Sequence, residues 1–177
     1  MRADSPFGAL KRFPVAWRGR ILRLSFNLHP AFRATGGRVQ FISTDLRHIR
    51  IRLPLVRRTR NIVGSIFGGS LFSVTDGVHV TLLFLNLDDD LIIWDKSASI
   101  RYRKPAYQTV YADFCLSDAD LNDVQQRLQQ HHELEHRFTV EIKDRLGVVH
   151  TQVERIVYIA QKDFYKKKYA SPPGDTS

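Results

Sequence analysis

The sequence predicts an α+β domain in which a bent antiparallel sheet of about six strands wraps around one central helix. Short segments in which apolar and polar residues alternate, the pattern of half-buried strands, recur along the chain. Between them lies one long apolar stretch, 69–86, with a row of side chains at helical spacing. That row consists of Leu71, Val74, Val78, Leu82 and Leu85. A sheet that curls around this stretch would bury it on nearly all sides.

The composition suits a single globular domain. The chain has 177 residues, of which 43% are hydrophobic and 25% charged. Cys115 is the only cysteine, which excludes an intrachain disulfide and fits a reducing cytoplasm. The formal net charge of +9 favours a phosphate-rich partner, such as nucleic acid, an anionic membrane or coenzyme A. The first residues lack the apolar core of a signal peptide, and we expect no membrane span.

We divide the chain into a lead, a domain and a tail. Residues 1–16 form the lead, because Pro6 and Pro14 discourage regular structure. The domain covers residues 17–162. The tail, 163–177, is basic, and we expect its proline-containing part, 166–177, to fray.

The N-terminal part of the domain predicts a helix and a strand hairpin. Residues 17–28 supply apolar positions for a short helix, which Pro30 ends. Residues 39–43 form a strand, and the strict alternation over 47–55 predicts its antiparallel partner.

The central stretch is predicted to be one helix over 69–86, although its local preferences conflict. Its β-branched residues and Gly77 disfavour a helix, whereas the spacing of its apolar residues favours one. Asp76 then lies about two turns into the helix. A carboxylate among apolar side chains is costly as mere packing, so Asp76 is a candidate for chemistry.

Beyond the central helix, the three carboxylates at 88–90 predict a solvated turn, since no calcium-loop spacing surrounds them. Residues 91–104 and 107–116 are expected to form a second hairpin, because Pro105 ends the first of these strands.

An outer helix is predicted over 117–130, capped by Ser117. Strands over 138–143 and 148–161 make the last hairpin. Between helix and hairpin stand His131, His132 and His136. Solvation at a helix end explains these histidines better than a metal site, and we expect no metal.

The glycine pair Gly68–Gly69 suits a close approach of a ligand to the backbone, because neither residue carries a Cβ. If a helix starts there, its first N–H groups have no partner inside the helix and can face an oxyanion.

Around this pair the sequence resembles a known motif. Asn61, Gly64, Gly68, Gly69 and Asp76 resemble N-x-x-G-x-x-H-G-G-x-x-x-x-x-x-D of the hotdog-fold acyl-CoA thioesterases, with the same spacing. Phe67 stands where that motif has histidine. The wider run, from 27–30 through 94–105, is similar to a subfamily described as tetrameric acyl-CoA thioesterase-like, which also carries Phe-Gly-Gly. The resemblance covers roughly residues 20–160. It implies a hotdog fold in which two subunits join their sheets and place the active sites between them.

The resemblance also implies the chemistry: hydrolysis of an acyl-CoA thioester, without a cofactor, by a homodimer or homotetramer. Asp76 would activate water or attack the carbonyl carbon, and the sequence leaves both routes open. The N–H group of Gly69, assisted by Gly68, would stabilise the oxyanion. Asn61 resembles the residue that orients water or substrate.

Further residues are candidates for contacts with the substrate: Phe67, Ser70, His79, Asp95, Arg101, Arg103 and Lys104. The basic residues among them are expected to hold the phosphates of coenzyme A, together with Arg57, Arg58 and Arg60. Asp95 either joins the site from the partner subunit or is a surface acid at a strand end. His79 either tunes Asp76 or is an interior histidine.

Two other functions stay open. Phe67 has no hydrogen-bonding group, which favours a non-catalytic acyl-thioester binder on the same fold. The net charge suggests a nucleic-acid-binding protein. The sequence carries no helix-turn-helix, zinc or RNA-binding motif, however, and we expect no nucleic-acid partner.

Overall fold

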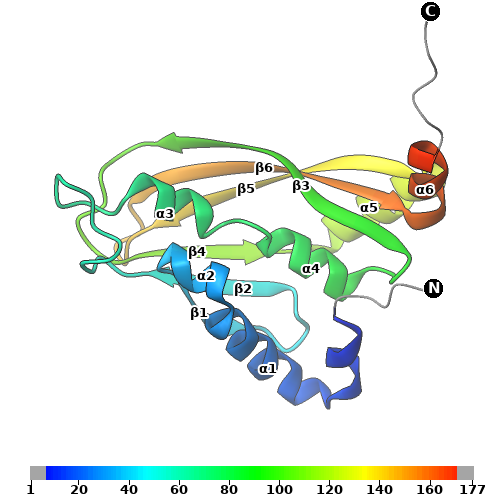
Figure 1. Ribbon diagram of the computed structural model, residues 1–177, viewed down its shortest axis with the longest axis horizontal. Helices are drawn as coiled ribbons and strands as arrows, with labels where there is room; N and C mark the ends of the chain where they lie inside the picture. Colours follow the sequence, from blue (N-terminus) through cyan, green and yellow to red (C-terminus); the bar gives the residue numbers. More distant parts are fainter. Residues whose placement is uncertain (1–6, 171–177) are drawn as a thin grey trace, which may run out of the picture.

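The structure, a computed structural model, describes residues 7–170 apart from the side chain of Lys11. One six-stranded antiparallel sheet, in the order β1-β2-β4-β5-β6-β3, curls around a helical segment (Figure 1). The strands are β1 (Arg38–Ile42), β2 (His48–Leu53), β3 (Leu91–Tyr102), β4 (Val110–Cys115), β5 (Glu133–Lys143) and β6 (Val149–Gln161). The expected α+β class and hotdog arrangement are confirmed.

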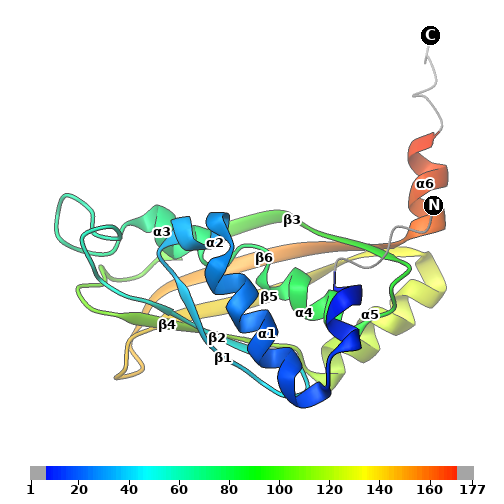
Figure 2. The same cartoon turned by 60° about the horizontal axis from the view of Figure 1, so that its bottom comes forward.

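The helices occupy several places around this sheet. They are η1 (Gly8–Arg12), α1 (Val15–Leu28), α2 (Pro30–Thr35), α3 (Gly68–Ser73), α4 (Val78–Asn86), α5 (Asp118–His131) and α6 (Lys162–Ala170). The central segment α3–α4 lies inside the curl, and α1 and α2 run beside it on the open side (Figures 1 and 2). Helix α5 packs against β5, and α6 continues from the end of β6.

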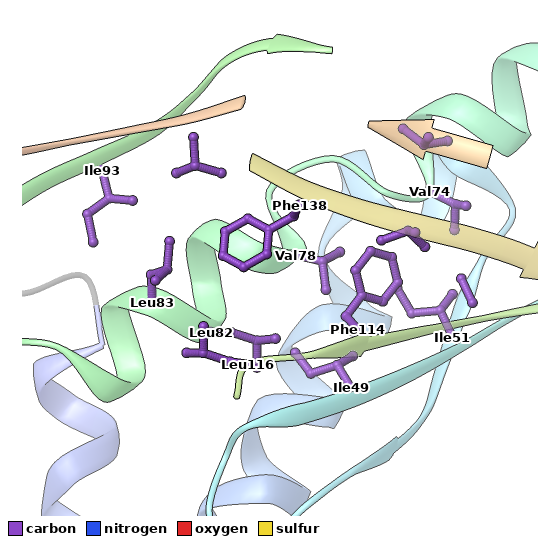
Figure 3. Close-up of a cluster of buried hydrophobic side chains, with 14 of the residues drawn as sticks. Ile49, Ile51, Val74, Val78, Leu82, Leu83, Ile93, Phe114, Leu116 and Phe138 are labelled. Atoms are coloured by element: carbon purple, nitrogen blue, oxygen red, sulfur yellow. The ribbon is translucent and has the colours of Figure 1, made fainter. Parts of the chain in front are cut away.

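The core confirms four of the five residues of the predicted apolar row, whereas Leu85 is only half-buried. Val74, Val78 and Leu82 are almost completely buried, as is Leu71. They face apolar side chains from strands on both sides of the curl (Figure 3). These include Ile49 and Ile51 of β2, Phe114 of β4 and Phe138 of β5. By length and hydropathy alone Gly68–Asn86 could span a membrane, but its apolar row packs inside the sheet, as core helices of globular proteins do.

The prediction of one continuous central helix is wrong. Val74 ends α3, and α4 begins only after Gly77. Gly77 has a φ of 68°, a left-handed conformation that glycine adopts without steric cost. The apolar spacing continues across the break, which is why periodicity alone did not reveal it.

The hairpin expected between 91–104 and 107–116 is also wrong. β3 pairs with β6 along its whole length, whereas β4 lies between β2 and β5. The connection between β3 and β4 therefore joins two strands that are separated in the sheet by β5 and β6. Consecutive strands pair in most sheets, but here the long strand β6 offers β3 a longer register. The other two hairpins, β1–β2 and β5–β6, are confirmed.

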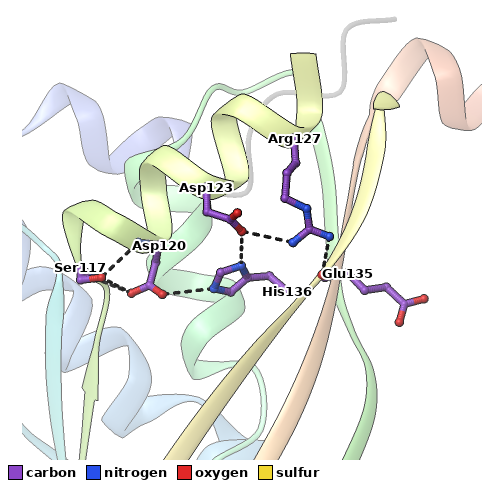
Figure 4. Close-up of polar contacts among 6 residues, drawn as sticks. All are labelled: Ser117, Asp120, Asp123, Arg127, Glu135 and His136. Atoms are coloured by element: carbon purple, nitrogen blue, oxygen red, sulfur yellow. Dashed lines mark hydrogen bonds and ion pairs between the residues drawn. The ribbon is translucent and has the colours of Figure 1, made fainter. Parts of the chain in front are cut away.

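The outer helix is confirmed, and His131 and His132 are exposed at its end as expected, but the expectation of solvation is wrong for His136, which is 11% exposed. The Ser117 side chain accepts a hydrogen bond from the Asp120 N–H, and the Ser117 N–H donates to the Asp120 carboxylate. His136 lies in β5 and contacts Asp120 and Asp123 on α5, each at 3.2 Å (Figure 4). His132, with a φ of 60°, turns the chain into β5, which therefore starts earlier than the predicted residue 138. Within residues 7–170, no three His, Cys, Asp or Glu side chains could hold a metal ion.

The ends of the domain carry more helix than expected. α2 and η1 had no counterpart in the prediction, and α1 begins at Val15. The expectation of a frayed tail is wrong for residues 166–170, which belong to α6. The rest of the tail and the first part of the lead lie outside the described residues.

Candidate active site

The break between α3 and α4 positions Asp76. Its side chain is 69% exposed, so the expectation of a buried acid within a helix is wrong. The reason is local: α3 ends before it, and Gly77 redirects the chain after it. A carboxylate at such a break is accessible to water and to a ligand.

Arg155 of β6 holds this carboxylate in place. Its side chain is only 4% exposed, and its Nη1 donates to Oδ1 of Asp76 at 2.7 Å and to Oδ2 of Asp95 at 3.2 Å. Nε and Nη2 donate to Oγ1 of Thr75 at 3.1 and 3.0 Å, and Nη2 also donates to the carbonyl oxygen of Phe72 at 3.3 Å. The guanidinium lies over the Phe72 ring at 5.1 Å. One buried cation thus ties the break in the central segment to β3 and β6.

Asp95 is not the exposed strand-end acid that the sequence left open, because its side chain is 14% exposed. Besides Arg155, the N–H of Gly77 donates to its Oδ2 at 2.9 Å, while its buried Oδ1 has no partner within residues 7–170. Burial raises the pKa of Asp95, and the negative charge of Asp76 acts in the same direction. Two carboxylates that contact one guanidinium therefore differ strongly in exposure.

We expect Asp95→Asn to become more stable relative to the parent as the pH rises. The folded-state pKa of Asp95 lies above its ordinary 3.8, so the folded protein binds this proton more tightly than the unfolded chain. That contribution to stability is fully present below pH 3.8 and is lost as the pH rises through the folded-state pKa, whereas asparagine stays neutral throughout. Urea unfolding between acid and neutral pH measures the difference, and Asp88→Asn on an exposed turn is the matched control. A difference that is constant with pH would contradict the expectation.

A cavity of about 620 Å³ opens beside this cluster. Asp76 and Arg155 form part of its wall, between α1 and α2 on one side and the break on the other. The rest of its lining is largely apolar and includes Leu22, Phe26, Phe32 and Phe72. A cavity of this size and character suits an apolar ligand with one polar end.

Gly68 and Gly69 form the first turn of α3, as predicted, so their N–H groups have no partner inside the helix. Each glycine also leaves room for an aromatic ring. A Cβ on Gly69 would lie 2.3 Å from the Phe67 ring, and a Cβ on Gly68 would lie 2.9 Å from the Tyr102 hydroxyl. The Tyr102 hydroxyl donates to the carbonyl oxygen of Gly68 at 3.1 Å. The end of β3 is thereby joined to the glycine pair.

Asn61 organises the loop before α3. Its Nδ2 donates to Oγ of Ser65 at 2.9 Å, and its Oδ1 accepts from the N–H groups of Val63 and Ser65. Both ends of the amide are thus used inside the loop, and Asn61 is absent from the cavity lining. In this chain Asn61 shapes the turn that leads to the glycine pair.

The other sequence-predicted residues are distributed over different surroundings. His79 is buried in the core, stacked on Phe138 at 4.0 Å, and burial lowers its pKa to about 3. It does not line the cavity with Asp76. Ser70 is buried in α3, whereas Phe67 is largely exposed at its start. Arg101, Arg103 and Lys104 are exposed at the end of β3, next to Tyr102.

Arg155 was missed by the sequence analysis, although a pattern pointed to it. Val153, Val157 and Ile159 occupy inward-facing positions of β6, and Arg155 falls in the same alternation. A charged residue at an inward-facing strand position rarely stays buried without a partner. That alternation was the available indication that β6 carries an arginine into the site.

Solved structures share this fold. The protein PA5026 of Pseudomonas aeruginosa, described as of unknown function and a probable thioesterase, superposes with a TM-score of 0.70 at 19% identity, covering 80% of this chain and 95% of that one. The Chlorobaculum tepidum protein OLEI01261, described as of unknown function, gives 0.63 at 12% identity, with coverages of 89% and 97%. The thioesterase HI1161 of Haemophilus influenzae gives 0.58 at 11% identity, with coverages of 85% and 92%. At these identities the similarity shows the fold.

Sequence comparison identifies the family directly. No curated protein matches the chain significantly. The family model described as "Domain of unknown function (DUF4442)" matches residues 18–159, which is most of the described domain. The chain belongs to the DUF4442 family.

Proposed function

We propose that this protein hydrolyses an acyl thioester, with acyl-CoA as substrate, in the cytoplasm. The observation that carries the proposal is the accessible carboxylate of Asp76, held by Arg155 at the wall of an apolar cavity of about 620 Å³. Solved structures of the same fold are described as thioesterases, which agrees with it. The cavity would hold the acyl chain away from water, while the thioester carbonyl meets the carboxylate.

Asp76 has the properties that the reaction needs. A general base must reach the water that attacks the carbonyl carbon, and an exposed carboxylate does so without rearrangement. The Nη1 of Arg155, at 2.7 Å, fixes one oxygen of the carboxylate, which at 69% exposure can accept a proton or attack the carbonyl itself. Both routes remain compatible with this geometry.

Within a single chain, the Gly69 N–H lies too far from Asp76 for the two groups to act on one carbonyl. Gly69 lies in the first turn of the six-residue helix α3, which is about 9 Å long at 1.5 Å per residue, and Asp76 lies beyond the end of this helix. A reacting carbonyl carbon has to lie about 3 Å from both the nucleophile and the oxyanion donors. We therefore propose that the Gly69 N–H acts with Asp76 of a second copy, so that each site is shared between two subunits.

The sheet offers a place for the second copy. β3 stands at the edge of the sheet, and its outer edge has no strand partner within residues 7–170. Joining two β3 edges would extend the sheet across the subunits and satisfy these backbone groups. A dimer, or a dimer of dimers, is the expected assembly.

Light scattering combined with assays on a dilution series tests this assembly. We expect a mass of at least twice 20.5 kDa at micromolar concentration, and a parallel loss of mass and specific activity on dilution. Full specific activity at a monodisperse mass of 20.5 kDa would contradict the shared site.

The basic residues at the end of β3 are proposed to hold the phosphates of coenzyme A. Tyr102 joins this end to Gly68, which brings Arg101, Arg103 and Lys104 to the side of the glycine pair. Arg103 is partly engaged, because its Nη2 donates to Gln152 at 2.8 Å, and its side chain remains exposed. Phosphate contacts exist equally in the ground and transition states, so they contribute to KM more than to kcat.

The second candidate function is a non-catalytic acyl-thioester binder. It is favoured by Phe67, whose exposed ring replaces the motif histidine and supplies no hydrogen bond. A panel of acyl-CoAs of increasing chain length separates the two functions by release of free coenzyme A. Turnover above background supports the hydrolase. Binding of a non-hydrolysable acyl-CoA analogue without turnover of any acyl-CoA supports the binder, and neither binding nor turnover would overturn both.

A further inference from the structure

The outward face of α1 carries an apolar ridge, which we define as Trp17, Leu24 and Leu28. At 100° per residue these three positions fall within about 40° of one another around the helix. Their side chains are 60%, 59% and 60% exposed. α1 runs along the outside of the molecule (Figure 2), so nothing within residues 7–170 covers the ridge.

The inward face of α1 is firmly attached, so the ridge is presented on a fixed support. Leu22 is buried in a small cluster with Leu10 and Leu46. The Asn27 side chain donates to the carbonyl oxygen of Val39 and accepts from its N–H, both at 2.9 Å. These contacts fasten the helix to β1, and turning the ridge inward would break them.

The segment that carries the ridge is strongly basic. Between Asp4 and Asp45 the sequence contains no aspartate or glutamate. Its basic residues are Lys11, Arg12, Arg18, Arg20, Arg23, Arg33 and Arg38. Arg12, Arg20 and Arg23 are exposed, and Arg20 and Arg23 lie on one flank of the ridge.

We propose that α1 docks on the surface of an anionic phospholipid membrane. An apolar row of tryptophan and leucine flanked by arginines is the arrangement with which helices lie in the plane of a bilayer interface. The ridge would enter the boundary between headgroups and acyl chains, and the arginines would meet the lipid phosphates. This docking does not depend on the proposed hydrolysis.

The charge and size of this face argue against other occupants. A second copy seated symmetrically through α1 would bring two basic segments without carboxylates together. α1 is about 21 Å long and 10 Å wide. Its face is therefore much smaller than the about 800 Å² per partner of a stable protein interface. A nucleic acid would bind the arginines but leave the apolar ridge without a matching surface.

The same helix lines the candidate site. Leu22, Ser25 and Phe26, on other faces of α1, contribute to the cavity wall beside Asp76. A membrane-docked α1 would therefore hold the cavity next to the lipid phase, where long acyl chains reside.

Co-sedimentation of the full chain with vesicles tests the docking. We expect binding to equimolar phosphatidylglycerol and phosphatidylcholine, weaker binding at high salt, and little binding to phosphatidylcholine alone. Combining Trp17→Ser, Leu24→Ser and Leu28→Ser should weaken binding by about tenfold or more. The matched control combines Ile62→Ser, Val63→Ser and Leu146→Ser, which removes three apolar residues elsewhere that are more exposed than the ridge, and it should leave binding intact.

The charges are tested in the same way. Combining Arg12→Glu and Arg20→Glu should reduce binding to the anionic vesicles by about tenfold or more. The control, Arg57→Glu with Arg58→Glu, makes the same change of net charge on another loop and should reduce binding much less. Circular dichroism and the Tm establish that each variant is folded.

Three outcomes would overturn the proposal. The first is an equal loss of vesicle binding in the ridge variants and their controls. The second is binding to duplex DNA that exceeds vesicle binding and survives loss of the ridge. The third is that the parent protein does not bind vesicles and that its mass in light scattering falls when the ridge is removed. The ridge would then be an interface between copies of the chain.

Discussion

Replacing Arg155 with methionine should lower the free energy of unfolding by about 3–5 kcal/mol. Arg155 is 4% exposed and donates to Asp76, Asp95, Thr75 and the carbonyl oxygen of Phe72. Methionine fills similar space but leaves the buried Asp95 carboxylate without a cation. Denaturant unfolding measures the loss.

Arg137→Met is the matched control for this prediction. Arg137, on β5, pairs with Glu154 at 3.0 Å, but its side chain is 67% exposed. Surface ion pairs contribute at most about 1 kcal/mol, so the loss here should be small. A further test follows from the cause: Asp95→Asn added to Arg155→Met should recover part of the stability, because it removes the uncompensated charge. The prediction is contradicted if the Arg155 and Arg137 variants lose equal amounts of unfolding free energy, or if adding Asp95→Asn recovers none of it. Either result would show that the buried charge pair does not hold the break together.

The local parts of this fold could be predicted from the sequence, because they follow from spacing along the chain. Leu71, Val74, Val78 and Leu82 are buried as the periodicity predicted, and only Leu85, at the end of the row, is half-buried. Ser117 caps α5 because its side chain and that of Asp120 bond each other's backbone N–H. The pairing of β3 with β6 could not be predicted in this way. It joins residues far apart in sequence, and competition between strands for partners decides it.

The candidate site likewise has features that could be predicted from the sequence and features that could not. The sequence marks Asp76 as a carboxylate in an apolar stretch and the glycine pair by its lack of Cβ atoms. The structure places the pair in the first turn of α3 and Asp76 beyond its end. The burial of Asp95 depends on its contacts with Gly77 and Arg155, which come from other elements. The conformation of Gly77 exposes Asp76. The break at Gly77 could not be predicted, because the apolar spacing continues across it. A charged residue at an inward strand position, as at Arg155, is the one long-range feature that the sequence could have indicated.

The exposure of Asp76 also changes the expected stability of its variants. For a buried acid, asparagine would relieve a desolvation penalty and stabilise the protein. Because the carboxylate is 69% exposed, Asp76→Asn should instead alter the free energy of unfolding by no more than about 1 kcal/mol. Asparagine keeps the oxygen that accepts from Arg155, so the break should retain its conformation.

The catalytic effect of Asp76→Asn should be much larger. An amide cannot take a proton from water at neutral pH and cannot attack as a carboxylate, so thioester hydrolysis should fall by about 10²–10⁴. Binding of a non-hydrolysable acyl-CoA analogue should persist, since the cavity wall keeps its shape. Asp88→Asn, the same substitution on an exposed turn, should leave the rate unchanged.

If Asp76→Asn hydrolyses acyl-CoA at the parent rate with an unchanged Tm, the carboxylate only positions the break. Catalysis would then have to come from Asp95, whose buried Oδ1 has no partner within residues 7–170, even though its 14% exposure makes contact with water poor. Because hydrolysis requires water at the reacting carbon, the accessible carboxylate is the better base of the two.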